Sequence, residues 1–220
     1  MSEKIRNIIF DLGGVILDID EKMAFHELQK KGFTDFDLLH GPEFQALFER
    51  FDRGILSAAT FRQRVKKLLG FPRMTDASFD DVWNSMLLDI PVERIRAIEE
   101  IKQHYRIFLM SNTNEIHYDL YVRDLQLRFG YAEFDDLFDK TYLSFDSHLR
   151  KPDPLFFELI LDQQGLKPEE TLFIDDSKPN IDAARKLGIH TFHIKREELV
   201  RNFFQNGVLR DDVEIDQDRA

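Results

Sequence analysis

The chain has 220 residues, of which 43% are apolar, so it is long enough to bury a sizeable core in one domain or in a core domain with a small insert. It contains no cysteine, which excludes a disulfide framework and a zinc–thiolate site, and its net charge of -11 argues against nonspecific binding to nucleic acid. No apolar run approaches the roughly 18 residues of a membrane span, and Asp11 breaks the first run too early for a signal peptide. We therefore expect a cytoplasmic protein that is neither exported nor membrane-spanning.

The first predicted element is a short buried strand, the apolar run NIIF at residues 7–10. Between residue 21 and about residue 88 the pattern changes to four amphipathic segments with helical spacing, punctuated by Gly or Pro. These segments are EKMAFHELQKKG, PEFQALFERFDRG, SAATFRQRVKKLLG and DASFDDVWNSMLL. The sequence thus predicts an all-helical insert directly after the first strand.

Beyond the insert, predicted strands and helices alternate. Apolar runs that suit parallel strands lie at 106–110, 141–143, 171–174 and 190–194. The segment 90–105 is predicted to be a helix, and so is SKPNIDAARKLGI, with Ser177 as its N-cap and Gly188 just past its end. This alternation predicts an α/β fold.

Two other segments carry signals for where helices begin and where structure ends. In RKPDPLFFELI, Asp153 stands at the N-cap position and Pro154 at the first helical position, so we expect Asp153 to be structural. The end of the chain, 210–220, is acidic and poor in apolar residues. It is predicted to be a frayed tail.

The residues that can carry chemistry stand where the predicted strands stop. They are Asp11 after the first strand, Ser111, Asn112 and Thr113 after the second, Lys151 in the loop after the third, and Asp175 and Asp176 after the fourth. In an open parallel sheet, ligands bind beyond the carboxyl ends of the strands. We therefore expect these groups to converge on one site.

Each of these residues also has a purely structural interpretation. Asp11 before two glycines is ordinary turn chemistry, and Ser111–Asn112 can cap the helix that follows. A single lysine such as Lys151 is usually solvated surface. The Asp175–Asp176 pair fits a structural role least, because adjacent carboxylates at the end of a buried strand repel each other unless a cation or hydrogen-bond donors compensate. Taken together, the four groups favour a functional site.

The residue types fit phosphoryl transfer. A carboxylate nucleophile beside an acidic pair indicates a hard divalent cation, and Mg²⁺ binds through one or two carboxylates together with substrate phosphate. Ser and Asn donors and a Lys can bind the remaining phosphoryl oxygens. Aspartyl-phosphate formation is a known form of covalent catalysis, in which the protein mainly positions groups and neutralises charge.

Four ordered stretches, IIFDLGGVI, FLMSNTN, LRKPDPLFF and FIDDSKPNIDAARKLGI, resemble the motifs of the haloacid dehalogenase (HAD) superfamily. The resemblance covers nearly the whole chain. It implies a Rossmann-like core of residues 1–20 and 89–220, with a parallel sheet of strand order 3-2-1-4-5, and a helical cap of the C1 type at 21–88. The phrases FERFDRGILSAATF and VWNSMLLDIP are similar to a branch that contains alpha-D-glucose-1-phosphate phosphatases.

The resemblance also implies roles for the site residues. Asp11 would be the nucleophile, and Lys151 would balance charge. The phosphate would be bound by Ser111, Asn112 and Lys151. The Mg²⁺ would be bound by Asp11, the backbone oxygen of Gly13 and Asp176, with Asp175 in support.

Gly13 departs from the usual pattern of the superfamily. Most of its phosphatases carry a second Asp two residues after the nucleophile, as the acid that protonates the leaving alcohol and the base that later activates water. A general acid or base contributes about 10²–10⁴-fold, so its loss should slow turnover without abolishing it. A group from the cap, or Asp18 or Asp20 of the hinge, is a candidate substitute. A glycine would also allow a positive φ, which would make substitution destabilising.

We therefore predict a Mg²⁺-dependent phosphatase that acts on a small phosphorylated metabolite, such as a hexose 1-phosphate, as a monomer or weak homodimer with no nucleic-acid or membrane partner. Two alternatives stay open: a phosphate-binding protein that has lost turnover, and a metal-independent haloacid dehalogenase. The Asp175–Asp176 pair argues against the dehalogenase, because it makes little sense beside Asp11 without a cation.

The insert is expected to choose the leaving group, since in capped enzymes of this fold it closes over the site. The candidate specificity residues are Glu49, Arg50, Arg53, Arg62 and Trp83. The 21 phenylalanines are expected simply to fill the core and the cap interface. The histidines His26, His40 and His148 are expected to be surface or capping residues.

Overall fold

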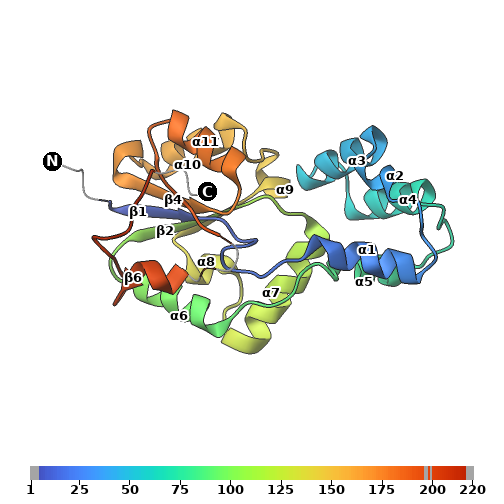
Figure 1. Ribbon diagram of the computed structural model, residues 1–220, viewed down its shortest axis with the longest axis horizontal. Coiled ribbons are helices and arrows are strands. Elements are labelled where there is room, and N and C mark those ends of the chain that lie inside the picture. Colours follow the sequence, from blue (N-terminus) through green and yellow to red (C-terminus); the bar gives the residue numbers. More distant parts are fainter. Residues whose placement is uncertain (1–4, 196–197, 199, 217–220) are drawn as a thin grey trace.

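The computed structural model describes residues 5–195, 198 and 200–216. Figure 1 shows a sheet covered by helices on both faces and, at one end, a separate group of helices from the first third of the chain. The described residues form a five-stranded sheet in the order β3-β2-β1-β4-β5, with every neighbouring pair parallel. The predicted α/β fold and strand order are therefore confirmed.

The strands begin and end within one residue of their predicted positions. They are β1 (Asn7–Phe10), β2 (Arg106–Ser111), β3 (Lys140–Leu143), β4 (Thr171–Asp175) and β5 (His190–His193). Their interior positions are mostly apolar and buried because helices cover both faces of a parallel sheet. In the register, Phe10 pairs with Leu109 on one side and Ile174 on the other. Asp11, Ser111 and Asp175 therefore come to the same edge of the sheet.

Two apolar layers hold the core helices to the sheet. On one face, buried residues of α6 (Val92–Ile101), α7 (Glu115–Phe129) and α8 (Phe134–Leu137) pack together, and on the other those of α10 (Pro154–Gln164) and α11 (Lys178–Lys186) do so (Figure 1). The remaining short elements are α9 (Ser144–Ser147), η1 (Pro168–Glu170), η2 (Val200–Phe203) and the antiparallel pair β6 (Phe204–Gln205) and β7 (Val208–Leu209).

The four predicted helices of the insert are all present, and a short α2 stands between the first two. The five helices are α1 (Glu21–Lys30), α2 (Asp37–His40), α3 (Pro42–Asp52), α4 (Ala58–Leu68) and α5 (Asp76–Asn84). These helices bury an aromatic cluster of their own, in which Phe51 stacks on Phe61 at 4.1 Å between ring centroids and Phe61 meets Trp83 edge-on at 5.0 Å. The insert thus has a core distinct from those on the sheet.

Most predicted helix ends are confirmed. The Asp153 carboxylate accepts from the Leu155 N–H at the start of α10, and Pro154 is its first residue. Ser177 precedes α11, and Gly188 follows it with a φ of 80°. The interpretation of Ser111–Asn112 as a helix cap is wrong, because the N-cap of α7 is Asn114, whose side chain accepts from the His117 N–H.

The expectation of a frayed tail is wrong for residues 210–216, and 217–220 lie outside the described residues. The Asp216 carboxylate accepts from the Thr191 N–H of β5 at 2.7 Å and lies 2.6 Å from Nδ1 of His190. Val213 and Ile215 pack against the core. This segment supplies a hydrogen-bond acceptor to the backbone of β5, an edge strand that would otherwise face solvent. None of the described helices is long and apolar enough to cross a membrane.

Candidate active site

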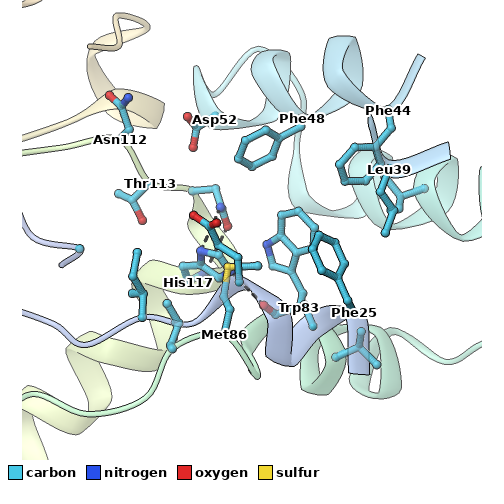
Figure 2. Close-up of a pocket in the computed structure, with 18 of the residues that line it drawn as sticks. Phe25, Leu39, Phe44, Phe48, Asp52, Trp83, Met86, Asn112, Thr113 and His117 are labelled. Carbon is cyan, nitrogen blue, oxygen red and sulfur yellow. Dashed lines mark hydrogen bonds between the residues drawn. The ribbon is translucent and has the colours of Figure 1, made fainter. Parts of the chain in front are cut away.

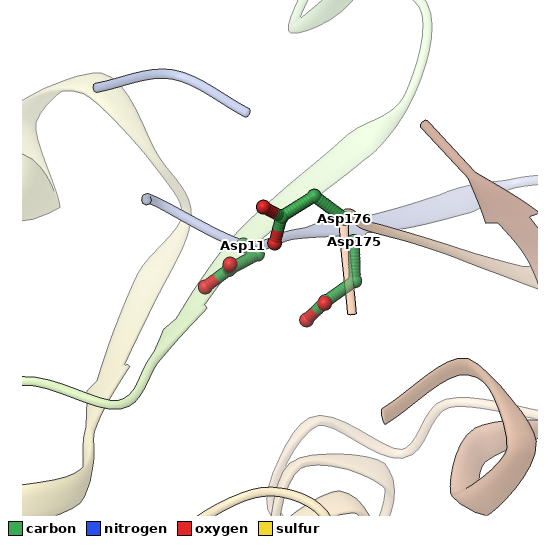
Figure 3. A group of neighbouring side chains, drawn as sticks. All are labelled: Asp11, Asp175 and Asp176. Atoms are coloured by element: carbon green, nitrogen blue, oxygen red, sulfur yellow. The ribbon is translucent and has the colours of Figure 1, made fainter. Parts of the chain in front are cut away.

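The structure brings four of the predicted site residues together at the ends of the strands. One carboxylate oxygen from each of Asp11, Asp175 and Asp176 lies within 4.8 Å of the other two, and Figure 3 shows the three side chains side by side. The Lys151 Nζ donates to Asp11 Oδ1 at 2.6 Å and to Asp175 Oδ2 at 2.7 Å. Lys151 is only 2% exposed, so its structural interpretation as a solvated surface lysine is wrong.

Asn112 holds the loop that carries Lys151. Its Oδ1 accepts from the Lys151 N–H at 2.8 Å, and its Nδ2 donates to the Lys151 carbonyl at 2.9 Å. Neither the second proton of the amide nor the Asn112 backbone N–H has a partner among the described residues, so both can bind a ligand. Ser111 ends β2, is buried and lines the same cavity as Asn112. The predicted phosphate-binding groups therefore lie on one rim.

Asp175 and Asp176 lie in different surroundings although they are adjacent. Asp175 is fully buried, and its carboxylate accepts from the Ser177 N–H, from Asn180 Nδ2 and from Lys151. Asp176 is half-buried and belongs to the carboxylate cluster. The oxygens of Asp175 thus hold the loop and the lysine.

The site has more negative than positive charge. Burial raises the pKa of Asp11 to about 7, Lys151 opposes this shift, and the neighbouring Asp175 and Asp176 add to it. The Lys151 ammonium group contacts two of the three carboxylates. Oxygen-only donors with an excess of negative charge suit a hard divalent cation such as Mg²⁺, so these residues can hold the metal that the sequence predicts.

The backbone at Gly13 differs from expectation. Its φ lies outside the left-handed region, and the neighbouring Gly14 has the positive φ, of 75°. A Cβ added at Gly13 would come within 3.2 Å of Ile19 Cδ1, a flexible side-chain end. The idea that Gly13 is needed for a positive φ is therefore wrong.

A cavity of about 340 Å³ lies between the strand ends and the helical insert. Gly13, Ser111 and Asn112 line its core end, and Figure 2 shows Phe25, Phe44, Phe48 and Trp83 converging from the insert. Phe44 belongs to the aromatic core of the insert and Phe25 and Phe48 pack against it, as expected, and all three also border the cavity.

Of the five candidate specificity residues, Trp83 is the one that lines this cavity. Arg62 pairs with Asp80 within the insert at 2.7 Å. Arg53 pairs with Glu49 and donates to the His148 carbonyl. Arg50 borders a different depression on the outer side of the insert. Arg62 and Arg50 therefore serve the insert and its surface, whereas Arg53 joins the insert to the core.

The histidines that the sequence singles out are exposed, as expected, although His40 also stands at the edge of the cavity. Sequence reasoning missed His117, which is buried between Asn114 and the Trp83 carbonyl. Burial lowers the pKa of its imidazole to about 4. The signal in the sequence that could have pointed to His117 was its position three residues after Asn114, the N-cap of α7.

Asp52 is a second residue that the sequence did not single out. It ends α3, is 3% exposed and lines the cavity from the insert side (Figure 2). Its Oδ2 lies 3.2 Å from Nε of Arg150, in the loop beside Lys151. Burial raises the pKa of this carboxyl to about 7, with Arg150 opposing. The pair joins the insert to the core next to the carboxylate cluster.

The fold and the site define a hydrolase of the haloacid dehalogenase type. The family model "haloacid dehalogenase-like hydrolase" matches residues 5–188, and the chain belongs to this family. It is 31% identical to the D-ribitol-5-phosphate phosphatase of Bacteroides thetaiotaomicron over 86% of this chain and 91% of the relative. It is 26% identical to the sesquiterpene phosphatase astK of Aspergillus oryzae over 88% and 92%.

Solved structures agree with this family. A structure of the HAD family enzyme BT-2542 of Bacteroides thetaiotaomicron, in complex with magnesium and inorganic phosphate, is 32% identical and has a TM-score of 0.82, over 91% of this chain and all of that one. A predicted HAD-like hydrolase of Porphyromonas gingivalis is 33% identical with a TM-score of 0.80, over 89% and 94%. The chain is thus a HAD-family phosphatase.

Proposed function

We propose that the protein is a Mg²⁺-dependent phosphatase that hydrolyses a small phosphate monoester through an aspartyl-phosphate at Asp11. The observation that carries the proposal is the buried Lys151, which bridges Asp11 and Asp175 beside a third carboxylate. The magnesium complexes of BT-2542 support the choice of metal.

The chain's own residues would act in two steps. A carboxylate oxygen of Asp11 attacks phosphorus, the ester bond breaks, and the alcohol oxygen leaves and takes a proton. Water then attacks phosphorus, which releases phosphate and regenerates Asp11. Bound Mg²⁺, held by Asp11, the Gly13 carbonyl and Asp176, would supply neutralisation of phosphoryl charge. Ser111, Asn112 and Lys151 would orient the phosphoryl oxygens throughout.

The helical insert would act as the cap. In this proposal residues 21–88 form a C1-type cap on a core of residues 1–20 and 89–220, which is supported by the separate aromatic core of the insert and by the cavity beneath it. The two hinge carboxylates have structural partners. Asp18 pairs with the buried Arg94 at 2.7 Å, and Asp20 accepts from the Lys22 N–H at the start of α1.

Asp52 is therefore our candidate for the cap-borne proton donor that replaces the missing acid. It is a buried carboxyl of the insert that lines the cavity. Its pKa of about 7 lets a substantial fraction carry a proton near neutral pH. If so, Asp52→Asn lowers turnover of alkyl phosphates, whose alkoxide needs a proton, far more than turnover of p-nitrophenyl phosphate, whose leaving group does not.

The alcohol part of the substrate is not fixed by similarity, because one relative named above is a D-ribitol-5-phosphate phosphatase and the other a sesquiterpene phosphatase. The sequence favours a sugar phosphate such as a hexose 1-phosphate. Among hexose phosphates, we predict that 1-phosphates turn over faster than 6-phosphates, because the anomeric oxygen is the less basic leaving group. A monomer or weak homodimer in the cytoplasm, without nucleic-acid or membrane partners, also stays a prediction.

The experiment is phosphate release from p-nitrophenyl phosphate and small phosphate esters, with and without Mg²⁺, by wild-type protein and by Asp11→Asn. We expect Mg²⁺-dependent release by wild type and almost none by the folded variant. Phosphate binding without release would instead identify a protein that has lost turnover. Metal-independent halide release from 2-haloacids would identify a dehalogenase.

A further inference from the structure

We propose that the alcohol of the substrate is predominantly apolar, with the phosphate at the strand ends and an alkyl or alkenyl tail in the cavity beneath the helical insert. This inference rests on the proposed phosphatase function and names its substrate class, in place of the sugar phosphate that the sequence alone favours. Its basis is the unequal distribution of polar groups along one continuous cavity.

The core end of the cavity is polar and its cap end is apolar. Gly13, Ser111 and Asn112 line the core end beside the carboxylate cluster. The cap end is lined mainly by large apolar side chains, among them Phe25, Leu39, Phe44, Phe48, Trp83 and Met86 (Figure 2). Such a cavity matches a molecule with one charged end and one apolar end.

Most polar side chains in the interior of the cavity wall are already hydrogen-bonded within the protein. The Asn114 and His117 side chains contact each other, and His117 Nε2 also lies 3.2 Å from the Trp83 carbonyl. The Tyr121 hydroxyl donates to Thr113 Oγ1 at 2.9 Å. These groups have little capacity left to bind the hydroxyls of a sugar.

Apart from Asp52, which pairs with Arg150, the polar residues of the insert that line the cavity are exposed. One of them, Gln45, donates to the Leu39 carbonyl. A polyol placed in the cavity would therefore bury hydroxyls against phenylalanine rings without partners. Each such hydroxyl lowers affinity by roughly ten-fold. An apolar tail avoids this loss and removes its own surface from water.

At the apolar end of the cavity, the indole of Trp83 carries a donor without a partner among the described residues. The Nε1 of Trp83 is buried and has no hydrogen-bond acceptor within the described part of the chain. The indole packs against Phe48 at 5.8 Å and His117 at 5.5 Å between ring centroids, so it is held in place. A single oxygen of the ligand would satisfy this donor, which fits a molecule with few oxygens beyond its phosphate.

The first test is a series of n-alkyl phosphates from ethyl to octyl, compared with ribitol 5-phosphate and glucose 1-phosphate in Mg²⁺. We expect kcat/KM to rise about four-fold per methylene until the tail fills the cavity. A flat series, or a preference of about ten-fold or more for the polyol or sugar ester, would overturn the inference.

Failure of the phosphatase proposal is detected separately. The chain has a single tryptophan, Trp83, so its fluorescence reports binding of alkyl phosphonates whether or not any ester is hydrolysed. Tighter binding with longer tails, without hydrolysis of p-nitrophenyl phosphate, would refute the proposed function and support the apolar cavity. Turnover of p-nitrophenyl phosphate with no dependence of binding on tail length would refute the apolar substrate alone.

A matched pair of substitutions locates the effect. Phe48→Asn introduces a polar group into the cavity wall, and Phe71→Asn makes the same change at a half-buried ring of the insert that packs on Phe33 and does not line the cavity. We expect the ratio of octyl phosphate to ribitol 5-phosphate turnover to fall about ten-fold or more in Phe48→Asn and to stay within about two-fold in Phe71→Asn. Equal ratios in both would overturn the proposal.

Discussion

Replacing Lys151 by Met tests whether the buried ammonium holds the carboxylates together. Its Nζ lies 2.6 Å from Asp11 Oδ1 and 2.7 Å from Asp175 Oδ2, and its side chain is almost fully buried. Removing one partner of a buried ion pair costs about 3–5 kcal/mol, because the other charge is left uncompensated. For a chain of this size 1 kcal/mol corresponds to about 2–4 °C, so we expect Tm to fall by about 6–20 °C.

The loss should depend on pH and on Mg²⁺. Asp11 has a pKa of about 7 with Lys151 present, and its protonation at lower pH removes one of the two uncompensated charges. The difference in Tm should therefore be larger at pH 8 than at pH 6, and added Mg²⁺ should restore part of it.

The control is Lys140→Met, which breaks the exposed pair between Lys140 and Asp135. Exposed pairs contribute about 0–1 kcal/mol, so its Tm should change little. Thermal unfolding by circular dichroism with and without Mg²⁺ measures both variants. Equal, small losses for Lys151→Met and Lys140→Met would refute the electrostatic account of the site.

Three further predictions follow from the geometry. Folding lowers the pKa of His117 from 6.5 to about 4, so between these pH values only the unfolded state binds the proton, and the free energy of unfolding falls by up to about 3 kcal/mol as the pH is lowered. Melting curves of His117→Gln should therefore show a smaller drop in stability between pH 7 and pH 4.5 than those of wild type. Measured by calorimetry, Asp176→Ala should weaken Mg²⁺ binding more than Asp175→Ala, whereas Asp175→Ala should lower Tm more, because the Asp175 oxygens hold the loop. Equal Mg²⁺ affinities of the two variants would contradict the direct role of Asp176 at the metal. Gly13→Asp should fold, since only the tip of Ile19 must shift, and it should speed hydrolysis of hexose 6-phosphates more than hydrolysis of 1-phosphates. A fall in Tm that corresponds to more than about 3 kcal/mol of stability would show that the backbone at Gly13 does not accept a side chain.

The sheet and the acidic cluster were predictable because both follow from short-range patterns and one topological rule. Apolar runs such as NIIF mark buried parallel strands, and polar residues directly after them must meet at one edge. The superfamily motifs then ordered the strands. Lys151 was placed at this edge by its position after the third predicted strand, but only the resemblance assigned it a charge-balancing role, since nothing local distinguishes it from a surface lysine.

What the sequence missed depends on contacts between distant segments. The chain stays extended past Ser111 because the Thr113 N–H bonds to Ser144 Oγ, which moves the cap of α7 to Asn114. The acidic tail docks through Asp216 on β5, although its composition predicts fraying. Neither partner lies close enough in sequence for periodicity or capping rules to find it.

The cavity shows the same limit on a larger scale. Spacing predicted that the phenylalanines of the insert face inward, but whether they fill a core or border a space depends on how five helices pack. The Asp52–Arg150 pair also forms only when the insert lies against the core. Specificity residues were therefore sought among charged helix faces, whereas the cavity wall is aromatic.

The central claim, a covalent phosphate on Asp11, is tested most directly by trapping the intermediate. With p-nitrophenyl phosphate, whose leaving group needs no proton, formation of the phosphoenzyme should be fast relative to its attack by water, so the phosphoenzyme should accumulate. Wild-type protein mixed with ³²P-labelled substrate and Mg²⁺ and quenched in acid should carry label on the peptide that contains Asp11. Hydroxylamine should release that label, and Asp11→Asn should carry none. Turnover without label on this peptide, or label retained in folded Asp11→Asn, would contradict the account.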